Sequence, residues 1–441
     1  MNKIYYWSLT VAIAGFLFGF DTAVISGADQ AIQNLWNTTP FFHGLFVMSS
    51  ALWGTVLGAL FGNIPTDRLG RKKTLVLIAA LYLGSALGSA LAGGPYTFAL
   101  LRFFGGVGVG ISSIAVPAYI SEIAPATVRG RLVATYQFQI VFGILVAFIS
   151  NFLLAGMITE DWRLMLGVEA VPALVYLLMV LRAPESPRWL LLHRNNEGEA
   201  RRVFKLLGSE NADETIATIR GEQRQHQDER LFKRQYRFPI LLAFLLAAFN
   251  QLSGINFIIY YAPRVFDMAG LDTSAALLST TGIGVVNLVF TLVGLSLIDG
   301  AGRKALMYIG SVGYILSLLT VAWAFSQDVG GIVVVSALFV FIASHAVGQG
   351  AVIWVFIAEI FPNSVRSKGQ SLGSGTHWVF AALVTLIMPY VLATFAAAEV
   401  FYFFAGAMML QLLFVGFLMP ETKGRTLEDV SAQLAQSRNK Q

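Results

Sequence analysis

The chain has 441 residues, of which 56% are hydrophobic and only 12% are charged, whereas about a quarter of the residues of a soluble domain carry charge. Its net charge of +5 would suit nucleic-acid binding, but the basic residues lie in short segments between apolar blocks, which is typical of membrane topology. Because the chain has no cysteine, disulfides, thiol nucleophiles and Cys-ligated zinc are excluded.

The apolar blocks are each roughly 20 residues long, which at about 1.5 Å per residue crosses the ~30 Å hydrocarbon core of a bilayer. We predict about twelve spanning helices, near residues 5–27, 43–64, 73–93, 97–120, 131–156, 164–183, 239–266, 273–298, 304–325, 331–358, 369–393 and 398–419. The first block contains Asp21 and has no small-residue cleavage pattern, so we expect it to be retained and not removed as a signal peptide.

One long polar stretch separates six predicted spans from six others. It mixes acidic and basic residues at spacings compatible with short surface helices. We therefore divide the chain into an N-terminal six-helix half (1–184), a cytoplasmic linker with short helices (185–237), a C-terminal six-helix half (238–420) and a cytoplasmic tail (421–441).

Three landmarks recur in the second half, in the same order and at nearly one spacing. The pairs are Asp67 and Asp299, 232 residues apart, Glu122 and Glu359, 237 apart, and Pro184 and Pro420, 236 apart. One such pair could arise by chance, but three in order indicate two homologous halves. The sequence thus predicts an all-α membrane protein with two pseudo-symmetric six-helix halves.

The distribution of Lys and Arg predicts the orientation in the membrane. Basic residues fall on alternate loops, namely Arg68, Arg71, Lys72, Lys73, Arg129, Arg131, Arg303, Lys304, Arg366 and Lys368, together with the linker and with Arg438 and Lys440 of the tail. The opposite loops carry almost none. We therefore expect both termini to be cytoplasmic.

These landmarks, read together, resemble the sugar porter family of the major facilitator superfamily, which includes proton-linked sugar symporters and facilitative glucose transporters. The resemblance covers nearly the whole chain and rests on residues 19–21 with 25–27, 67–72, Arg102, Glu122 with 129–130, 184–189, Gln251 with 254–256, and 420–424. It implies the major facilitator fold, a bacterial inner-membrane location, and transport of a hexose or pentose.

Charges at the cytoplasmic helix ends can bridge neighbouring helices, since an Asp followed by Gly-Arg-Lys supplies both a tight turn and paired charges. Simple positive-inside anchoring would explain the basic residues but not the carboxylates. With the resemblance, this favours a gating network of Asp67, Arg68, Arg71, Glu122, Arg129, Glu185, Arg188, Asp299, Arg303, Glu359, Arg366 and Glu421. Gly300 stands where the family usually has a basic residue, so we expect the second copy of this network to be weaker.

Two opposite charges lie inside predicted spans at similar depth. Asp21 and Arg102 are each roughly 7 to 10 Å from the outer surface, so they can pair, and an unpaired charge there would cost several kcal/mol. Asp21 can take up a proton, whereas Arg102 cannot lose one, which predicts a proton switch; a static ion pair is the alternative. By resemblance, this carboxylate couples protons in symporters, although some facilitative carriers also keep Asp.

A neutral polyol needs side chains that both donate and accept hydrogen bonds, together with aromatic surfaces. The candidates within spans are Gln137, Gln139, Asn250, Gln251, Asn256, Asn287, Trp354 and Trp378. A single amide could equally be an interhelical hydrogen bond. Three of these amides, however, flank Gly254 within two turns and interrupt an apolar helix near mid-membrane, as transporter sites often do.

The resemblance assigns sugar-site positions to Gln137, Gln251, Asn256, Asn287 and Trp354, with Phe18, Tyr260 and Trp378 nearby. The chain departs from the family at Asn250 and His377, at His345, and in lacking prolines over 350–353, so the identity of the sugar stays open. For His377, donation to a hydroxyl, pH sensing and an interhelical bond all remain open, whereas His345 is expected to bond another helix.

The sequence therefore favours proton-coupled symport of a monosaccharide by alternating access. A facilitative sugar uniporter and a sugar-sensing membrane receptor of the same fold are the alternatives. No phosphate loop, metal cluster or nucleophile triad is apparent, so we expect no enzyme, no metal and no cofactor. The expected partners are the sugar, a proton and membrane lipid, with no nucleic acid, and the protein is expected to be monomeric.

Overall fold

The computed structural model describes residues 3–208, 212–225, 229–362 and 364–424, and every regular element in these ranges is a helix. Within them, eleven helices are long and apolar enough to cross a membrane, or twelve if Pro40–Met48 and Ser50–Phe61, bent by 42°, form one span. The predicted all-α fold with about twelve spans is confirmed.

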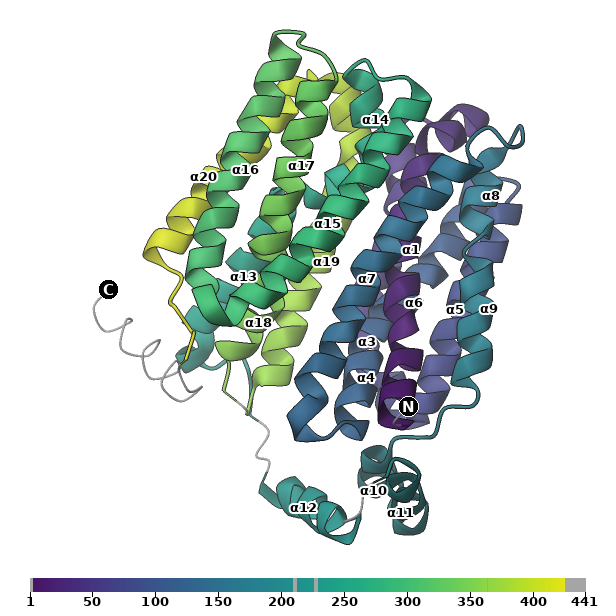
Figure 1. Ribbon diagram of the computed structural model, residues 1–441, viewed down its shortest axis with the longest axis vertical. Coiled ribbons are helices and arrows are strands. Elements are labelled where there is room, and N and C mark those ends of the chain that lie inside the picture. Colours follow the sequence, from purple (N-terminus) through teal and green to yellow (C-terminus); the bar gives the residue numbers. More distant parts are fainter. Residues whose placement is uncertain (1–2, 209–211, 226–228, 363, 425–441) are drawn as a thin grey trace. The chain divides into compact units, whose positions relative to one another are not determined.

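The first of two compact units comprises Met1–Val24, Ser50–Ser150 and Gly156–Gln227. In it, α3 and α5 both pack along α6, and α9 packs on α5 (Figure 1). Its helices are the first parts of α1 (Lys3–Trp36) and α7 (Ala126–Leu154), and α3 (Ser50–Phe61), α4 (Asn63–Leu69), α5 (Arg71–Leu91), α6 (Pro95–Ile123), α8 (Asp161–Gly167), α9 (Ala170–Val180), α10 (Pro187–Arg194), α11 (Glu197–Leu206) and α12 (Ala212–Gln225).

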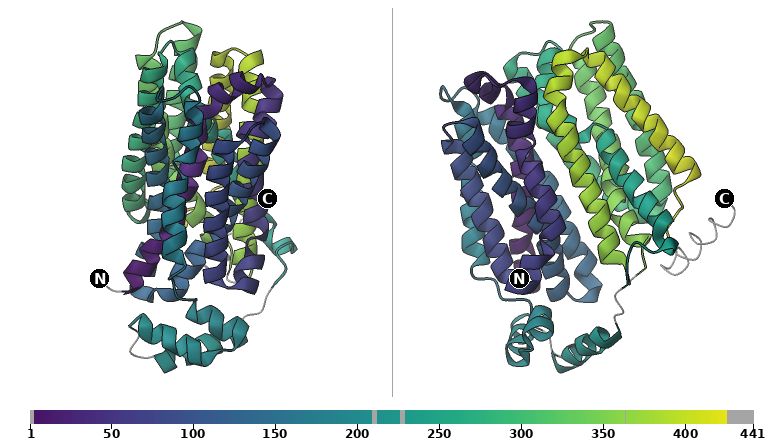
Figure 2. Two further views of the ribbon diagram at one scale, coloured as in Figure 1. Left: turned by 90° about the vertical axis from the view of Figure 1, so that its right-hand side faces the viewer. Right: turned by 180° about the vertical axis from the view of Figure 1, so that it is seen from behind.

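The second unit comprises Ile25–Ser49, Asn151–Ala155 and Asp228–Gln441. In it, α16 packs on both α17 and α20, and α13 packs on α19. The helices from α13 to α20 are drawn in teal to yellow in Figure 2. Its elements are the rest of α1, α2 (Pro40–Phe42), η1 (His43–Met48), η2 (Arg234–Tyr236), α13 (Arg237–Leu252), α14 (Ile255–Met268), α15 (Thr273–Ala301), α16 (Arg303–Ser326), α17 (Ile332–Val347), α18 (Gln349–Glu359), α19 (Arg366–Thr394) and α20 (Ala397–Phe417).

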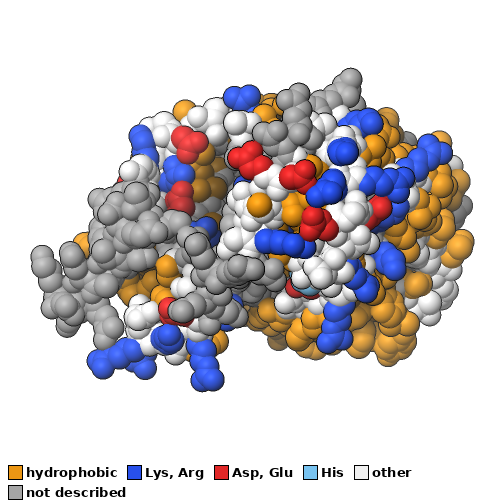
Figure 3. Space-filling model, turned by 90° about the horizontal axis from the view of Figure 1, so that it is seen from below, with side chains coloured by type: hydrophobic (Ala, Val, Ile, Leu, Met, Phe, Trp, Pro, Cys, Tyr) orange, Lys and Arg blue, Asp and Glu red, His pale blue; other side chains and the backbone are white. Residues whose placement is uncertain are grey.

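The polar stretch between the predicted halves forms the short helices that its spacing indicates. Ser186 caps α10 by accepting a hydrogen bond from the Trp189 backbone N–H at 3.2 Å, and Pro187 occupies the first turn. Asn195, in the left-handed conformation, ends the helix. Lys, Arg, Asp and Glu side chains gather on the face seen from below, whereas hydrophobic side chains cover its flank (Figure 3).

The same turn occurs in both copies of the repeat. Gly70, with φ 94° and ψ 165°, precedes α5, and Gly302, with φ 93° and ψ 161°, precedes α16. A Cβ atom would lie 2.4 Å from Glu185 Oε2 at the first position and 2.7 Å from Glu421 Oε2 at the second. Only glycine fits either place, because the backbone conformation and the neighbouring carboxylate both exclude a side chain.

We expect Gly302→Ala to destabilise the protein by about 1–3 kcal/mol, since a residue with a Cβ is strained in this region of φ and ψ. Gly300→Ala is the matched control, because Gly300 lies within α15 and a Cβ there meets no atom within 4 Å. The control should be neutral or stabilising by up to about 1 kcal/mol, as alanine favours helices. Thermal unfolding of both variants in detergent measures the difference, and equal shifts would contradict the explanation.

Candidate functional site

A break in one membrane span places three of the predicted amides side by side. The span Arg234–Met268 is interrupted where α13 ends at Leu252 and α14 begins at Ile255, with Gly254 between them at φ 86°. Ser253 Oγ satisfies the exposed backbone, donating to Asn250 O at 2.6 Å and accepting from Ile255 N at 3.3 Å. The predicted interruption of this helix is therefore present.

Gln251 is the centre of a polar cluster at this break. Its Nε2 donates to Asn250 Oδ1 at 2.9 Å and lies 3.3 Å from the His377 ring nitrogens, while its Oε1 accepts from Asn256 Nδ2 at 2.8 Å. The Trp354 ring lies 5.0 Å from the His377 ring, and its side chain is 38% exposed, whereas the three amides are buried. Amides, an imidazole and an indole from α13, α14, α18 and α19 thus converge, which suits a polyol.

The other predicted sugar-site residues lie in different surroundings. Trp378 packs its ring 4.8 Å from that of His377, and Tyr260 is buried on α14. Asn287, on α15, accepts a long hydrogen bond of 3.5 Å from Thr291. Gln137 on α7 and Phe18 on α1 belong to the first unit, so their part in a sugar site stays a prediction.

His345 lies outside the cluster and bonds another helix, as predicted. Its Nδ1 is hydrogen-bonded to the hydroxyl of Tyr314, which links α17 to α16. The sequence analysis missed two further amides of this unit, Gln349 and Gln411, both fully buried and hydrogen-bonded to each other. A polar residue in an apolar span was the signal in each case.

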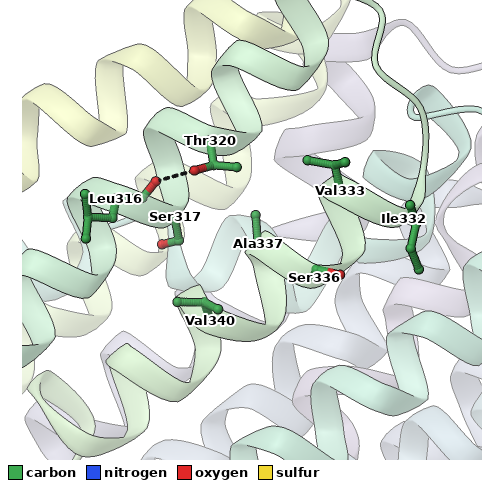
Figure 4. A pocket seen from close by; sticks show the side chains of 8 residues that line it. All are labelled: Leu316, Ser317, Thr320, Ile332, Val333, Ser336, Ala337 and Val340. Atoms are coloured by element: carbon green, nitrogen blue, oxygen red, sulfur yellow. Dashed lines mark hydrogen bonds between the residues drawn. The ribbon is translucent and has the colours of Figure 1, made fainter.

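An open groove of about 370 Å³ lies between α16 and α17 (Figure 4). Its rim is apolar and exposed, with Ile332 77% accessible. The hydroxyls of Ser317 and Thr320 donate to carbonyls of their own helix. Ser336 of α17 also lines the groove and is exposed, so apart from this one hydroxyl the groove offers apolar surface, which suits a polyol poorly.

In the first unit, the predicted pair of buried charges is formed. Arg102 Nη1 makes an ion pair with Asp21 Oδ1, and Arg102 Nη2 donates to Asp21 O at 2.8 Å. Both residues are 2% exposed. The bidentate contact joins α1 to α6 and compensates two charges that would be costly alone.

A third charged residue of this region, Glu169, was missed by the sequence analysis. It is 1% exposed, immediately precedes α9, and is close enough to Asp21 and Arg102 to interact electrostatically with both. Among the described residues, its Oε1 has no hydrogen-bond partner. The available signal was a single carboxylate inside a predicted span, where a charge is rarely found without a function.

The first copy of the predicted gating network is organised by one arginine. Arg71 Nη2 lies 2.8 Å from Glu122 Oε1, and Arg71 Nη1 lies 3.2 Å from Asp67 Oδ1 and 3.0 Å from Thr66 O. Trp189 Nε1 adds a hydrogen bond of 2.7 Å to Asp67 O. These bonds connect α4, α5, α6 and α10 at one end of the unit.

The second copy repeats these contacts. Arg303 Nη2 lies 2.7 Å from Glu359 Oε1, and Arg303 Nη1 lies 3.1 Å from Asp299 Oδ1 and 2.9 Å from Ile298 O. We expected a weaker network because of Gly300, yet Arg303 makes the same set of bonds as its counterpart. The missing basic side chain therefore removes none of these contacts.

The remaining basic residues of the predicted network behave differently. Arg129 donates to Ala124 O at 3.4 Å and Arg366 donates to Phe361 O at 3.5 Å, so both bind their own segments. Arg68 makes no ion pair with any other described residue, and Arg188 has contacts of its own. Four of the six predicted carboxylates, Asp67, Glu122, Asp299 and Glu359, are thus paired with two arginines, one in each copy.

Glu185 and Glu421 occupy equivalent places but differ in acidity. Burial raises the pKa of the Glu185 carboxyl, and its hydrogen bonds from backbone N–H groups offset only part of this. Burial also acts to raise the pKa of Glu421, but four backbone N–H donors outweigh it, so this pKa lies below its usual value of 4.5. These donors are Lys423, Lys304, Arg303 and Thr422.

The second unit contains one more buried ionic cluster, which the sequence analysis missed. Asp29 on α1 lies 2.8 Å from His43 Nε2 and accepts two bonds from Arg264 of α14, at 2.8 and 3.0 Å. His43 and Asp29 are almost fully buried. The cluster ties the end of α1 to η1 and α14, and its members are too far apart in sequence for spacing to reveal it.

The family whose description is "Sugar (and other) transporter" matches residues 7–434 of this chain. The chain belongs to this sugar transporter family. It is therefore a membrane transporter and not an enzyme. The helical architecture, the broken span and the repeated charged loops are the features that this assignment accounts for.

Proteins of similar sequence and structure match this chain over nearly its full length. A D-xylose-proton symporter of Escherichia coli (strain K12) is 33% identical, with 98% of this chain and 96% of that protein covered. An arabinose-proton symporter of Bacillus subtilis (strain 168) is 34% identical, with 96% and 93% covered. The inward-open structure of the xylose transporter from E. coli has a TM-score of 0.86 at 31% identity, covering 98% of this chain and 99% of that one.

The pKa of Glu185 is raised and that of Glu421 is lowered, so replacing each by glutamine should change thermal stability with opposite pH dependence. The lowered pKa of Glu421 means that its charged form stabilises the folded protein above pH 4.5, and that this contribution is lost as the pH falls through the lowered value. We therefore expect Glu421→Gln to lower the midpoint of thermal unfolding at pH 7, with the gap to the wild type closing in acid.

Glu185→Gln is the matched control, with the opposite sign. Because the pKa of Glu185 is raised, its protonated form stabilises the folded protein fully below pH 4.5, and this stabilisation is lost as the pH rises through the raised value. The unfolding midpoint of the glutamine variant at pH 7 should therefore equal or exceed that of the wild type. Unfolding midpoints in detergent between about pH 4 and pH 7 provide the comparison. Parallel curves for both variants would contradict the assignment.

Proposed function

We propose that this transporter moves a monosaccharide together with a proton across the inner membrane by alternating access. Its relatives include proteins named as xylose-proton and arabinose-proton symporters. The observation that carries the proposal is the buried Asp21–Arg102 pair, in a chain whose cluster at the broken span is neutral. In this proposal the carboxylate of Asp21 binds the proton, and the neutral amides of the cluster bind the sugar.

In this proposal the sugar binds at the cluster around Gln251. Its amides present donors and acceptors without charge, and the partly exposed Trp354 offers a flat apolar surface to the C–H face of a sugar ring. Asn256 Oδ1 accepts no hydrogen bond from the described residues, so it is available for a sugar hydroxyl. Asn250, His377 and Trp378 adjoin this cluster, and Gln137, Asn287, Phe18 and Tyr260 remain sugar-site residues predicted from the family resemblance.

The proton binds at Asp21 in this proposal. Protonation would remove one charge of the ion pair and leave Arg102 as a buried cation that must find another partner. Glu169, a buried carboxylate that interacts electrostatically with both, is our candidate for that role. Proton binding therefore changes the relative free energies of the arrangements of α1 and α6.

We further propose that both termini face the cytoplasm and that the transporter acts as a monomer. The positive-inside distribution of Lys and Arg supports the orientation. The Arg71 and Arg303 networks would then lie on the cytoplasmic side and act as gates whose ion pairs form and break during the cycle.

Gln251→Ala should reduce uptake at limiting sugar by roughly tenfold or more, because it removes a donor and an acceptor from the centre of the cluster. Gln327→Ala is the control, since Gln327 is exposed at the end of α16 and bonds only to Ser326. Uptake into liposomes measures the effect, with yield and unfolding midpoint as checks on insertion. Unchanged uptake by the Gln251 variant would make this amide structural.

Asp21→Asn should abolish accumulation of sugar driven by an inward proton gradient, while exchange of labelled for unlabelled sugar continues, because the variant can still bind sugar but cannot change charge. Both assays use the same liposomes, and the wild type with a protonophore is the reference. Accumulation by the wild type that ignores the gradient would instead identify a facilitative uniporter.

A further inference from the structure

The hydrogen bonds of the proposed sugar site continue away from it, deep into the second unit. On the side of Gln251 opposite Asn256, Asn250 Nδ2 donates to Gln349 Oε1 at 3.3 Å. Gln349 Nε2 then donates to Gln411 Oε1 at 2.7 Å. The bonds run from α13 through α18 to α20, and every amide nitrogen donates in the same direction.

The chain ends at a group that can only accept. Gln411 Nε2 donates to Ser311 Oγ at 2.8 Å, and Ser311 Oγ donates its own hydrogen to Met307 O at 2.7 Å. A carbonyl can only accept, so in this arrangement the hydroxyl hydrogen lies on Met307 O and the serine oxygen accepts from Gln411. The series therefore ends at the carbonyl of Met307, a group that accepts and cannot pass a hydrogen on.

No member of the series can reverse alone. Gln349, Gln411 and Ser311 are each 0% exposed, so no solvent can satisfy a misplaced donor or acceptor. Turning one amide around would set oxygen against oxygen on one side and nitrogen against nitrogen on the other, leaving buried groups unpaired. Aligned amides also polarise one another, which strengthens each bond.

We propose that Gln349, Gln411 and Ser311 are positioning residues of the sugar site, which determine through this chain of hydrogen bonds which atoms the site presents as donors and which as acceptors. This rests on the proposed function, because it assumes that the sugar binds at Gln251 and Asn256. None of the three touches the sugar; each acts through the next amide.

The direction of the chain specifies what the sugar meets. Asn256 Nδ2 donates to Gln251 Oε1, which leaves Asn256 Oδ1, with no donor among the described residues, as an acceptor for a hydroxyl hydrogen. Gln251 Nε2 keeps one hydrogen beyond its bond to Asn250 and points it toward His377. A ring nitrogen of His377 that meets this hydrogen is an acceptor, so the histidine completes the pattern.

The test compares two serine-to-alanine changes on one helix. Ser311→Ala removes the end of the chain, whereas Ser317→Ala, also on α16, removes a buried hydroxyl that bonds only to carbonyls of its own helix. Gln411→Met, which keeps the length of the side chain, breaks the chain one link earlier.

The first readout needs no sugar. The purified transporter is labelled with ¹⁵N in the side-chain amides of Asn and Gln, and Asn256 is assigned by its loss in Asn256→Asp. Ser311→Ala and Gln411→Met should each shift the Asn256 resonance, although both changes lie several hydrogen bonds away along the chain of amides. Ser317→Ala should leave this resonance unchanged. An Asn256 resonance unmoved by Ser311→Ala and Gln411→Met overturns the proposal.

The second readout is selectivity in liposomes, as KM for the transported sugar and for its monodeoxy analogues. Ser311→Ala and Gln411→Met should raise KM for the parent sugar by roughly threefold to tenfold, the effect of about one hydrogen bond, and narrow the preference over the analogue lacking the bound hydroxyl. A loss of maximal rate with unchanged relative KM values would mean a structural role only and overturn the proposal. A wild type that takes up no monosaccharide would overturn the proposed function, while the resonance experiment would still decide on the chain.

Discussion

The structure depends on the fact that the hydrocarbon layer supplies no water, so each polar group placed there must find its partner within the protein. The broken span illustrates this constraint. Interrupting α13 and α14 at Gly254 frees backbone groups in mid-span, and Ser253 binds on both sides of the break. The amides beside this break hydrogen-bond to one another. The amide atoms that stay without a partner among the described residues, such as Asn256 Oδ1, are the ones that a polyol can bind.

Charge is distributed under the same constraint. At the ends of the spans, Arg71 and Arg303 each gather two carboxylates and a backbone carbonyl, where residual exposure to solvent reduces the cost of desolvation. Within the first unit, Asp21, Arg102 and Glu169 are nearly inaccessible, so a change in the protonation of either carboxylate would alter the energy of the packed helices. The structure thus has arginine–carboxylate networks at the ends of its spans and a fully buried Asp21–Arg102 pair in its interior.

Much of this organisation could be predicted from the sequence because it depends on local pattern. Hydropathy gives the spans, the recurrence of Asp67 at Asp299 gives the repeat, and equal depth pairs Asp21 with Arg102. The clusters of Gln349 with Gln411, and of Asp29 with His43 and Arg264, could not be predicted, because they depend on which faces of distant helices meet. A span that is apolar on all sides has no periodicity to indicate its inward face.

The one-way order of the buried amides restricts how the transporter can diverge. A carboxylate or an apolar side chain in place of Gln349 or Gln411 would leave the neighbouring amides of the series without a donor or an acceptor. Substitutions at these two positions must therefore occur together to be tolerated. Residues beside the series, such as Trp354 and Asn287, carry no such obligation. Relatives with new sugar preferences should therefore differ first at these flanking positions, with the interior amides inherited as a block.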